Sequence, residues 1–460
     1  MGRIFGTDGA RGVANTEISC KLAMNIGRAT AMVVAQEKKR KVTFLVGKDT
    51  RISSDMLECA ITAGLCSVGA DVIQVGYVPT PAVAYLVKDM KADGGIMLSA
   101  SHNSFEYNGI KIFGGNGFKL TDDEEFEIEE IVLDHTLPYD IKWDDELGRI
   151  TQDHSAVDKY VDHIVSTVDM DLSGYKIALD CSNGSASATA EKIFSRLNAD
   201  VTIISSSPNG VNINNNCGST HIGQLSKFVA DNGFDMGFAF DGDADRCLAV
   251  DADGNLVDGD KIIAILSGYF KSQNKLKNDA AVVTLMSNMG FFKFAKENGI
   301  TAEMTKVGDR YVLERLIEKD YTIGGEQSGH VIFRDYMTTG DGQLTAVQIV
   351  AALKHMGKTL KEAATIMKVF PQRIINVRAD KEMKKRLDTD KGIIMAKENF
   401  EKELGDSGRI LLRPSGTEPV IRVMVEGENE EQITTIAESL AQTIKERLEY
   451  NEDCKKLEGI

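Results

Sequence analysis

The sequence has little of what several classes of protein require. Its seven cysteines are scattered, without a CxxC pair, so neither a disulfide framework nor a zinc site is expected, and a reducing cytoplasm fits best. There is no signal-peptide pattern and no apolar run of about 18 residues, so we expect no membrane partner. The formal net charge of −16 argues against nucleic-acid binding, which needs a basic face.

What the chain does contain is a repeated alternation of strand and helix patterns. Short apolar runs at 42–47, 72–76 and 94–100 predict strands, and apolar residues between 56 and 68 fall on one helical face. This alternation predicts a sheet covered by helices on both sides. The length of 460 residues predicts three or four such domains.

The same plan recurs later in the chain. The expected strands at 176–181 and 281–286 are each followed by a Ser-Asn-(x)-Gly run and a helical pattern, which suggests duplicated domains. Beyond Phe370-Pro371 the pattern changes to short strands and helices, typical of an α+β domain. Its final helix has apolar residues at helical spacing, which we interpret as core.

Three carboxylates follow directly after an expected strand at 236–240. Asp241, Asp243 and Asp245 alternate with small residues, so they can converge on one hard cation. The calcium loop of an EF-hand is excluded, because its sixth and twelfth positions hold Arg246 and Ala252 here. The alternative to a metal site is an acidic turn on the protein surface. The concentrated charge beside an apolar strand favours a magnesium site.

A serine cluster closes the expected strand at 94–100. Ser101 lies in the run Ser-Ala-Ser-His-Asn, where sites form in α/β domains, and its hydroxyl is a candidate nucleophile. No GxSxG elbow surrounds it, so acyl transfer is disfavoured. Taken alone, a Ser-His-Asn run in a loop more often serves only to stabilise a turn through side-chain hydrogen bonds to the backbone.

Two more polar loops complete the set. The run GGEQSGH at 324–330 can approach a polyhydroxylated ligand, although a plain glycine-rich connection is equally compatible. The run RPSGTEP at 413–419, with Arg422 beyond it, has the parts of a phosphate clamp, or of a bland turn with a surface arginine. A metal site, an acceptor hydroxyl, a polyol loop and a phosphate clamp together predict phosphoryl transfer on a sugar phosphate.

The order of these motifs resembles the α-D-phosphohexomutase family over essentially the whole chain. The matching runs are GTDGARG at 6–12, SASHN at 99–103 with NGIK at 108–111, DGDADR at 241–246, VGDRYV at 307–312, GGEQSGH and RPSGTEP. The resemblance implies an α/β fold: a heart-shaped molecule of three similar mixed α/β domains plus a C-terminal α+β domain around a central cleft. The expected domains are 1–154, 155–254, 255–369 and 370–460.

The resemblance also implies a role for each matching residue. Ser101 would carry a phosphate that completes a Mg²⁺ site with the three aspartates, and a sugar 1,6-bisphosphate would serve as activator. Lys111 and His330 would act as general acid and base, and Arg11, His102 and Arg246 would assist electrostatically. Sugar hydroxyls would be bound by Glu326 and Ser328, and the non-reacting phosphate by Arg413, Ser415, Gly416, Thr417 and Arg422.

Further runs, PNGVNIN at 208–214, CGSTH at 217–221 and TTGDGQLTA at 338–346, are most similar to family members that act on amino sugars. The expected reaction is therefore the interconversion of glucosamine 6-phosphate and glucosamine 1-phosphate, which feeds UDP-N-acetylglucosamine synthesis, by a monomer or homodimer. Glucose or mannose phosphate as substrate, a magnesium-dependent sugar phosphatase and a non-catalytic binding member remain alternatives. Ser104 replaces the family's usual proline, which predicts a looser loop near Asn103.

Overall fold

A computed structural model describes residues 2–6, 8–36, 38, 40–415 and 419–457, with side chains up to residue 448. The chain forms two compact units. One contains the chain up to Ser287 together with Asn298–Ile366, and the other contains Asn288–Glu297 and the chain from Met367 onward. Within the described residues, no helix is long and apolar enough to cross a membrane.

The first sheet of the larger unit has the strand order β1-β2-β6-β5-β3-β4-β7. Strands β3, β4 and β5 run parallel, and β6 pairs antiparallel with β5. Its strands are β1 (Phe5–Gly6), β2 (Gly9–Val13), β3 (Thr43–Lys48), β4 (Asp71–Tyr77), β5 (Gly94–Leu98), β6 (Tyr107–Gly114) and β7 (Ile150–Gln152), and its helices are α1 (Cys20–Ala35), α2 (Ile52–Ser67), α3 (Thr80–Asp89) and α4 (Asp122–Glu129). The expected strands at 42–47, 72–76 and 94–100 are confirmed as β3, β4 and β5.

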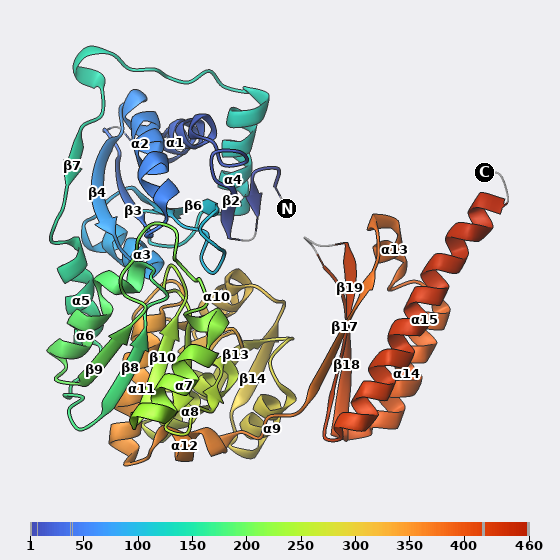
Figure 1. Cartoon of the computed structure of the whole chain (residues 1–460). Helices are drawn as coiled ribbons and strands as arrows, with labels where there is room; N and C mark the ends of the chain where they lie inside the picture. Colours follow the sequence, from blue (N-terminus) through green and yellow to red (C-terminus); the bar gives the residue numbers. More distant parts are fainter. Residues whose placement is uncertain (1, 7, 37, 39, 416–418, 458–460) are drawn as a thin grey trace. The chain divides into compact units, whose positions relative to one another are not determined.

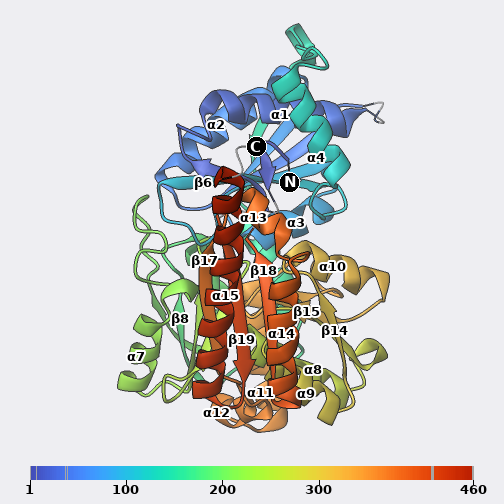
Figure 2. The same cartoon turned by 90° about the vertical axis from the view of Figure 1, so that its right-hand side faces the viewer.

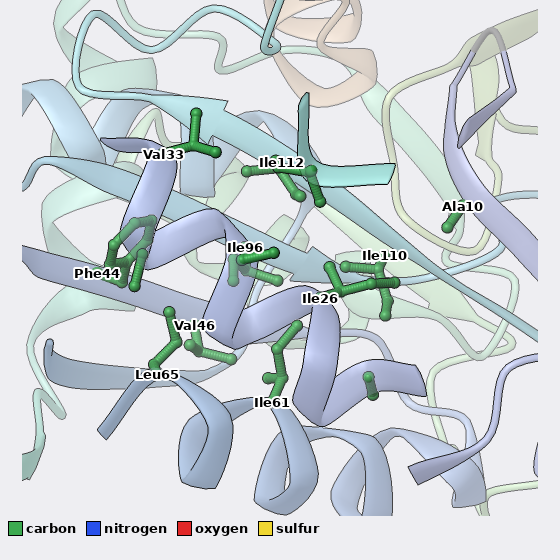
Figure 3. Packing of buried hydrophobic residues seen from close by; sticks show 14 of the residues in the cluster. Ala10, Ile26, Val33, Phe44, Val46, Ile61, Leu65, Ile96, Ile110 and Ile112 are labelled. Atoms are coloured by element: carbon green, nitrogen blue, oxygen red, sulfur yellow. The ribbon is translucent and has the colours of Figure 1, made fainter. Parts of the chain in front are cut away.

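The core of this domain lies between α1, α2 and the sheet. Figure 3 shows Ile26 of α1 and Ile61 of α2 directed toward Ile96 of β5 and Val46 of β3. All four side chains are fully buried, and each contributes about 1.5–3 kcal/mol by leaving water. This packing fixes the strands whose C-terminal ends bear the polar loops.

A second sheet has the order β12-β11-β10-β8-β9, and a third has the order β14-β13-β15-β16 (Figure 1). The second sheet and the helices beside it in the sequence are α5 (Ala156–Ser166), β8 (Lys176–Asp180), α6 (Ala190–Arg196), β9 (Asp200–Ile204), α7 (Gly223–Asn232), β10 (Met236–Phe240), β11 (Cys247–Asp251) and β12 (Leu256–Val257). The third sheet and the helices beside it in the sequence are α8 (Gly259–Ser272), β13 (Ala280–Thr284), β14 (Thr301–Thr305), α10 (Asp309–Glu318), β15 (Ile323–Gly325), β16 (Val331–Phe333), α11 (Gly342–Met356) and α12 (Leu360–Ala363).

The smaller unit is built on an antiparallel sheet of order β17-β19-β18. Helices α14 and α15 lie side by side over one face of that sheet (Figure 2). Its elements are β17 (Gln372–Arg378), α13 (Lys381–Arg386), α14 (Lys391–Leu404), β18 (Gly408–Pro414), β19 (Val420–Gly427) and α15 (Glu430–Leu457), and α9 (Met289–Glu297) joins them. The apolar stripe of the final helix is core, as expected: Ile433, Leu440 and Leu448 are buried.

Candidate active site

The reactive serine candidate lies in the loop between β5 and β6. Ser101 is 1% exposed, and its backbone adopts φ 52°, a left-handed conformation that is uncommon outside glycine. Its hydroxyl donates to Asp241 Oδ2 at 2.6 Å. The loop after β5 thus meets the loop after β10.

The three aspartates converge. Asp241, Asp243 and Asp245 each offer a carboxylate oxygen within 4.8 Å of the others, and all three are buried. Gly242 lets the aspartate loop lie close to the serine loop, because a Cβ there would lie 2.5 Å from the Ser101 carbonyl oxygen. Among the described residues, this is the one group of His, Cys, Asp or Glu side chains with metal-ligand spacing.

The donor set fits a magnesium ion. One buried oxygen of Asp243 and one of Asp245 have no hydrogen-bond partner, although buried polar atoms usually find one. Burial and the charges of Asp245 and Asp243 raise the pKa of Asp241 well above its ordinary value. Three clustered carboxylates with unsatisfied oxygens are the arrangement that a hard divalent cation stabilises.

Lys111 lies within the same cluster. Its Nζ is 2.8 Å from Asp243, 2.9 Å from Asp8 and 3.3 Å from Asp245. Burial opposes the ammonium form, but the carboxylates of Asp243, Asp8 and Asp245 outweigh it and raise the pKa of Lys111 well above its ordinary value. Lys111 is therefore an ammonium group that offsets part of the aspartate charge.

His330 lies at the edge of the cluster, next to Asp245. Its Nδ1 lies 3.7 Å from Asp245, and its Nε2 accepts from the backbone N–H of Gly340 at 3.0 Å. Burial lowers the pKa of His330, but the hydrogen bond and charge of Asp245 outweigh this effect and leave it raised. A neutral ring that accepts at Nε2 carries its hydrogen on Nδ1, facing Asp245.

His102 and Arg246 form a pair beside Ser101. Arg246 Nη1 donates to His102 Nδ1 at 2.9 Å, and His102 Nδ1 also lies 3.3 Å from Ser101 Oγ. Burial and the charges of Arg246 and Arg11 lower the pKa of His102 to about 4, so the ring is neutral at pH 7. Arg11 is placed nearby through Asn103 Oδ1 at 3.1 Å.

Glu326 and Ser328 occupy the loop between β15 and β16. Glu326 accepts from the Gly308 N–H at 3.0 Å, and its charge contributes to the raised pKa of His330. Ser328 is exposed. The loop thus presents polar side chains next to His330.

The predicted phosphate clamp lies in the smaller unit. Arg413 of β18 and Arg422 of β19 are directly opposite each other on the antiparallel ladder, and both are half-buried. Two cations on one face of a sheet repel, unless an anion lies between them. Ser415 is buried, and its carbonyl accepts from Lys384 Nζ at 2.5 Å. Gly416 and Thr417 lie outside the described residues.

Three charged residues that the sequence analysis did not select belong to the same network. Asp8 contacts Lys119 at 2.5 Å as well as Lys111, and Lys119 Nζ is 2.6 Å from Asp309. Asp8 lies within the run GTDGARG and Asp309 within VGDRYV. Those motifs were therefore the available signal, whereas Lys119 lies in none of them.

This fold, with a buried serine beside three aspartates, is that of a sugar-phosphate mutase. Models of the phosphoglucomutase/phosphomannomutase family match along the chain: alpha/beta/alpha domain I at 2–138, domain II at 158–254, domain III at 258–370 and the C-terminal domain at 374–443. The chain belongs to this family of phosphohexomutases.

Individual proteins of the family are similar to this chain along nearly its whole length. The chain is 52% identical to the phosphoglucosamine mutase of Clostridium novyi, over 97% of this chain and 99% of that protein. It is 50% identical to the phosphoglucosamine mutase of Acetivibrio thermocellus, over 97% and 100%.

Solved structures share the fold. A phosphoglucomutase/phosphomannomutase family protein from Burkholderia thailandensis has a TM-score of 0.83 at 23% identity, covering 97% of both chains. The N-acetylphosphoglucosamine mutase of Aspergillus fumigatus, solved with GlcNAc-6P and magnesium, has a TM-score of 0.71 at 16% identity, covering 96% of this chain and 95% of that one.

Proposed function

We propose that this chain is a phosphoglucosamine mutase, which interconverts glucosamine 6-phosphate and glucosamine 1-phosphate. The observation that carries the proposal is the identity of about 50% to phosphoglucosamine mutases across nearly the full length of both chains. We place the reaction in the cytoplasm, where its product supplies amino-sugar nucleotide synthesis. The domain boundaries at 154, 254 and 369, and a monomeric or homodimeric state, belong to the same proposal.

Ser101 carries the phosphoryl group in the working enzyme. Its P–Oγ bond breaks as the phosphorus forms a bond to the free hydroxyl of the sugar, and the product is a sugar bisphosphate. The proton that leaves the sugar hydroxyl is balanced by the one that Ser101 Oγ gains. The bisphosphate then turns over and returns its other phosphoryl group to Ser101, and added sugar 1,6-bisphosphate loads the enzyme by the same step.

Asp241, Asp243 and Asp245 would hold a Mg²⁺ ion beside the phosphorylated Ser101. The ion, when bound, neutralises charge on the transferring group. The two partnerless carboxylate oxygens support this assignment. Lys111 and Arg246 supply fixed positive charge at the same point, so the chain itself stabilises the phosphoryl oxygens.

Protons are handled by Lys111 and His330. Lys111, as an ammonium group, can donate a proton to a leaving oxygen, and we assign the complementary proton transfer to His330, which lies next to Asp245 at the edge of the cluster. His102 and Arg11 act electrostatically. His102 holds Arg246 next to Ser101, and Arg11 bridges Asn103 and Asp8.

Glu326 and Ser328 bind the sugar hydroxyls, and the clamp of the smaller unit binds the phosphate that is not reacting. The clamp comprises Arg413, Ser415, Gly416, Thr417 and Arg422. The ladder pair Arg413 and Arg422 supports this role, because two guanidinium groups on one face can fork a phosphate.

The proposal is tested by phosphorus NMR of the protein with Mg²⁺ and a trace of glucose 1,6-bisphosphate. Glucosamine 6-phosphate, glucose 6-phosphate and mannose 6-phosphate are offered separately, with Ser101→Ala as the control. We expect rapid conversion of glucosamine 6-phosphate to the 1-phosphate by the wild type alone. Faster turnover of glucose or mannose phosphate would overturn the amino-sugar assignment, and release of free phosphate would indicate a phosphatase.

A further inference from the structure

A fully buried arginine outside the four motif loops holds the backbone around Ser101. Arg51 follows β3, and its side chain is 0% exposed. Its guanidinium donates to the carbonyl oxygens of Ser101 at 2.9 Å, Asn103 at 2.8 Å, Tyr107 at 3.0 Å and Ser104. Its Nε donates to Asp49 Oδ2 at 2.8 Å. A guanidinium has five N–H donors, and here five acceptors receive them.

Asp49 extends the same support to the amide side of Ser101. Its Oδ2 also accepts from Ser99 Oγ at 2.6 Å, and Ser99 Oγ in turn accepts from the Ser101 N–H at 2.9 Å. Ser54 Oγ donates to the other oxygen of Asp49 at 2.9 Å. The peptide groups on both sides of Ser101 are therefore anchored to one buried ion pair.

This anchoring has a conformational purpose. A serine at φ 52° is held in a strained region of backbone conformation that persists only where the surroundings enforce it. Asn214 Nδ2 adds a hydrogen bond of 2.9 Å to each of the Ser101 and Asn103 carbonyls. Ser104 lacks the ring that proline would contribute to loop stiffness, and its carbonyl is one of the groups that Arg51 holds.

We propose that Arg51, fixed by Asp49, is a positioning residue that keeps Ser101 in its left-handed conformation and aims its oxygen at the aspartates. This inference rests on the proposed function, because it assumes that Ser101 receives a phosphoryl group. Arg51 touches neither the reacting atoms nor the aspartate cluster in the described contacts. Its effect therefore falls on the rate of phosphoryl transfer and leaves substrate affinity nearly unchanged.

The experiment measures the rate at which labelled glucose 1,6-bisphosphate phosphorylates Ser101 in dephosphorylated enzyme, together with kcat and KM. Arg51→Lys keeps the charge but has only three donors, so it cannot reach the four carbonyls. We expect loading and kcat to fall about 100-fold, since misplacement of a reacting group by about 1 Å has effects of that order. KM should change less than about threefold, because this loss lies in positioning and not in ground-state binding.

Asp93→Asn is the matched control. Asp93 precedes β5, at the end opposite Ser101, and is a buried carboxylate paired with Arg40 at 2.7 Å. This variant should lower the melting temperature and leave loading unchanged. Ser99→Ala is the milder test, in case Arg51→Lys does not fold: it removes the link from Asp49 to the Ser101 amide and should slow loading about tenfold, in line with the loss of one buried hydrogen bond.

The outcomes separate the two proposals. If the wild type itself takes up no label, the phosphoserine mechanism fails. If the wild type is labelled and both Arg51→Lys and Ser99→Ala are labelled at its rate, the positioning role of Arg51 fails. A loss of loading in Asp93→Asn equal to that in Arg51→Lys would reassign the effect to general destabilisation, and would also overturn the role.

Discussion

The serine–aspartate site and the arginine clamp differ in how firmly the chain holds them. Ser101, Lys111 and the aspartates are buried and linked by short hydrogen bonds, and the pKa values of Lys111 and Asp241 are raised well above their ordinary values by burial and by the neighbouring charges. Arg413 and Arg422 lie half-buried on a three-strand ladder in a separate compact unit. This difference fits the proposed role of each region. Forming and breaking bonds to phosphorus needs a fixed site of low dielectric constant. A clamp that binds either of two phosphates must accommodate two orientations of the sugar.

Removing the serine hydroxyl should have the largest effect. Ser101→Ala is expected to lower kcat by at least about 10⁴-fold, as loss of a nucleophile does. The fold should persist, since the anchoring contacts of this loop involve the backbone of Ser101. Turnover and thermal unfolding measured on the same preparation check this prediction. Activity close to that of the wild type would contradict the phosphoserine mechanism.

Changing one aspartate should separate metal binding from folding. Asp241→Asn removes one of three repelling carboxylates, and we expect equal or higher stability without metal, because burial and its neighbours disfavour the charged form. The rise in melting temperature caused by Mg²⁺ should disappear, because ligand binding stabilises only a competent site. Calorimetric scans with and without Mg²⁺ provide the measurement. An undiminished Mg²⁺ effect would place the ion elsewhere.

Weakening the clamp should mainly affect substrate binding. Arg422→Met removes one fork from a phosphate that does not react, so KM should rise about 10–100-fold with a smaller change in kcat. Steady-state kinetics with glucosamine 6-phosphate measure both constants. Arg378→Met, on the neighbouring strand β17, is the control. A large fall in kcat at constant KM would instead place Arg422 among the reacting groups.

A last prediction concerns stability and not turnover: the pH dependence of unfolding at Asp341, which caps α11. Burial raises the pKa of Asp341 from 3.8 to about 6. A carboxyl whose pKa is raised on folding stabilises the protein below pH 3.8, and that stability is lost as pH rises through 6. The loss is on the order of 3 kcal/mol. Asp341→Asn keeps a helix cap and should flatten unfolding curves over this window, as denaturant titrations from pH 4 to 7 would show. An unchanged pH profile would contradict the raised pKa.

Local pattern was sufficient for much of this molecule. The alternation of apolar runs predicted β3, β4, β5 and β10, and the spacing of the aspartates at 241, 243 and 245 predicted their convergence. The runs 182–184 and 287–290 follow β8 and β13 as expected. Each of these features depends on residues within one strand and the turn after it, so short-range periodicity contains the necessary information.

The serine loop shows where local pattern stops. The missing proline at Ser104 predicted a looser loop, yet its carbonyls are held by Arg51 and Asn214, which come from positions about 50 and 110 residues away. The helix α9 follows β13 in sequence but packs with the smaller unit. Neither outcome is visible in composition or motif.

The sequence by itself determined the class of fold, the order of the motifs and the side chains proposed to react, because these depend on residue type and local spacing. Only the tertiary structure decided which distant groups stabilise them: Arg51 and Asp49 under Ser101, and Asp8, Lys119 and Asp309 around Lys111. The physical reason is strand order. Parallel neighbours such as β3 and β5 are paired by packing of the helices between them, and that pairing brings the end of β3 next to the serine loop.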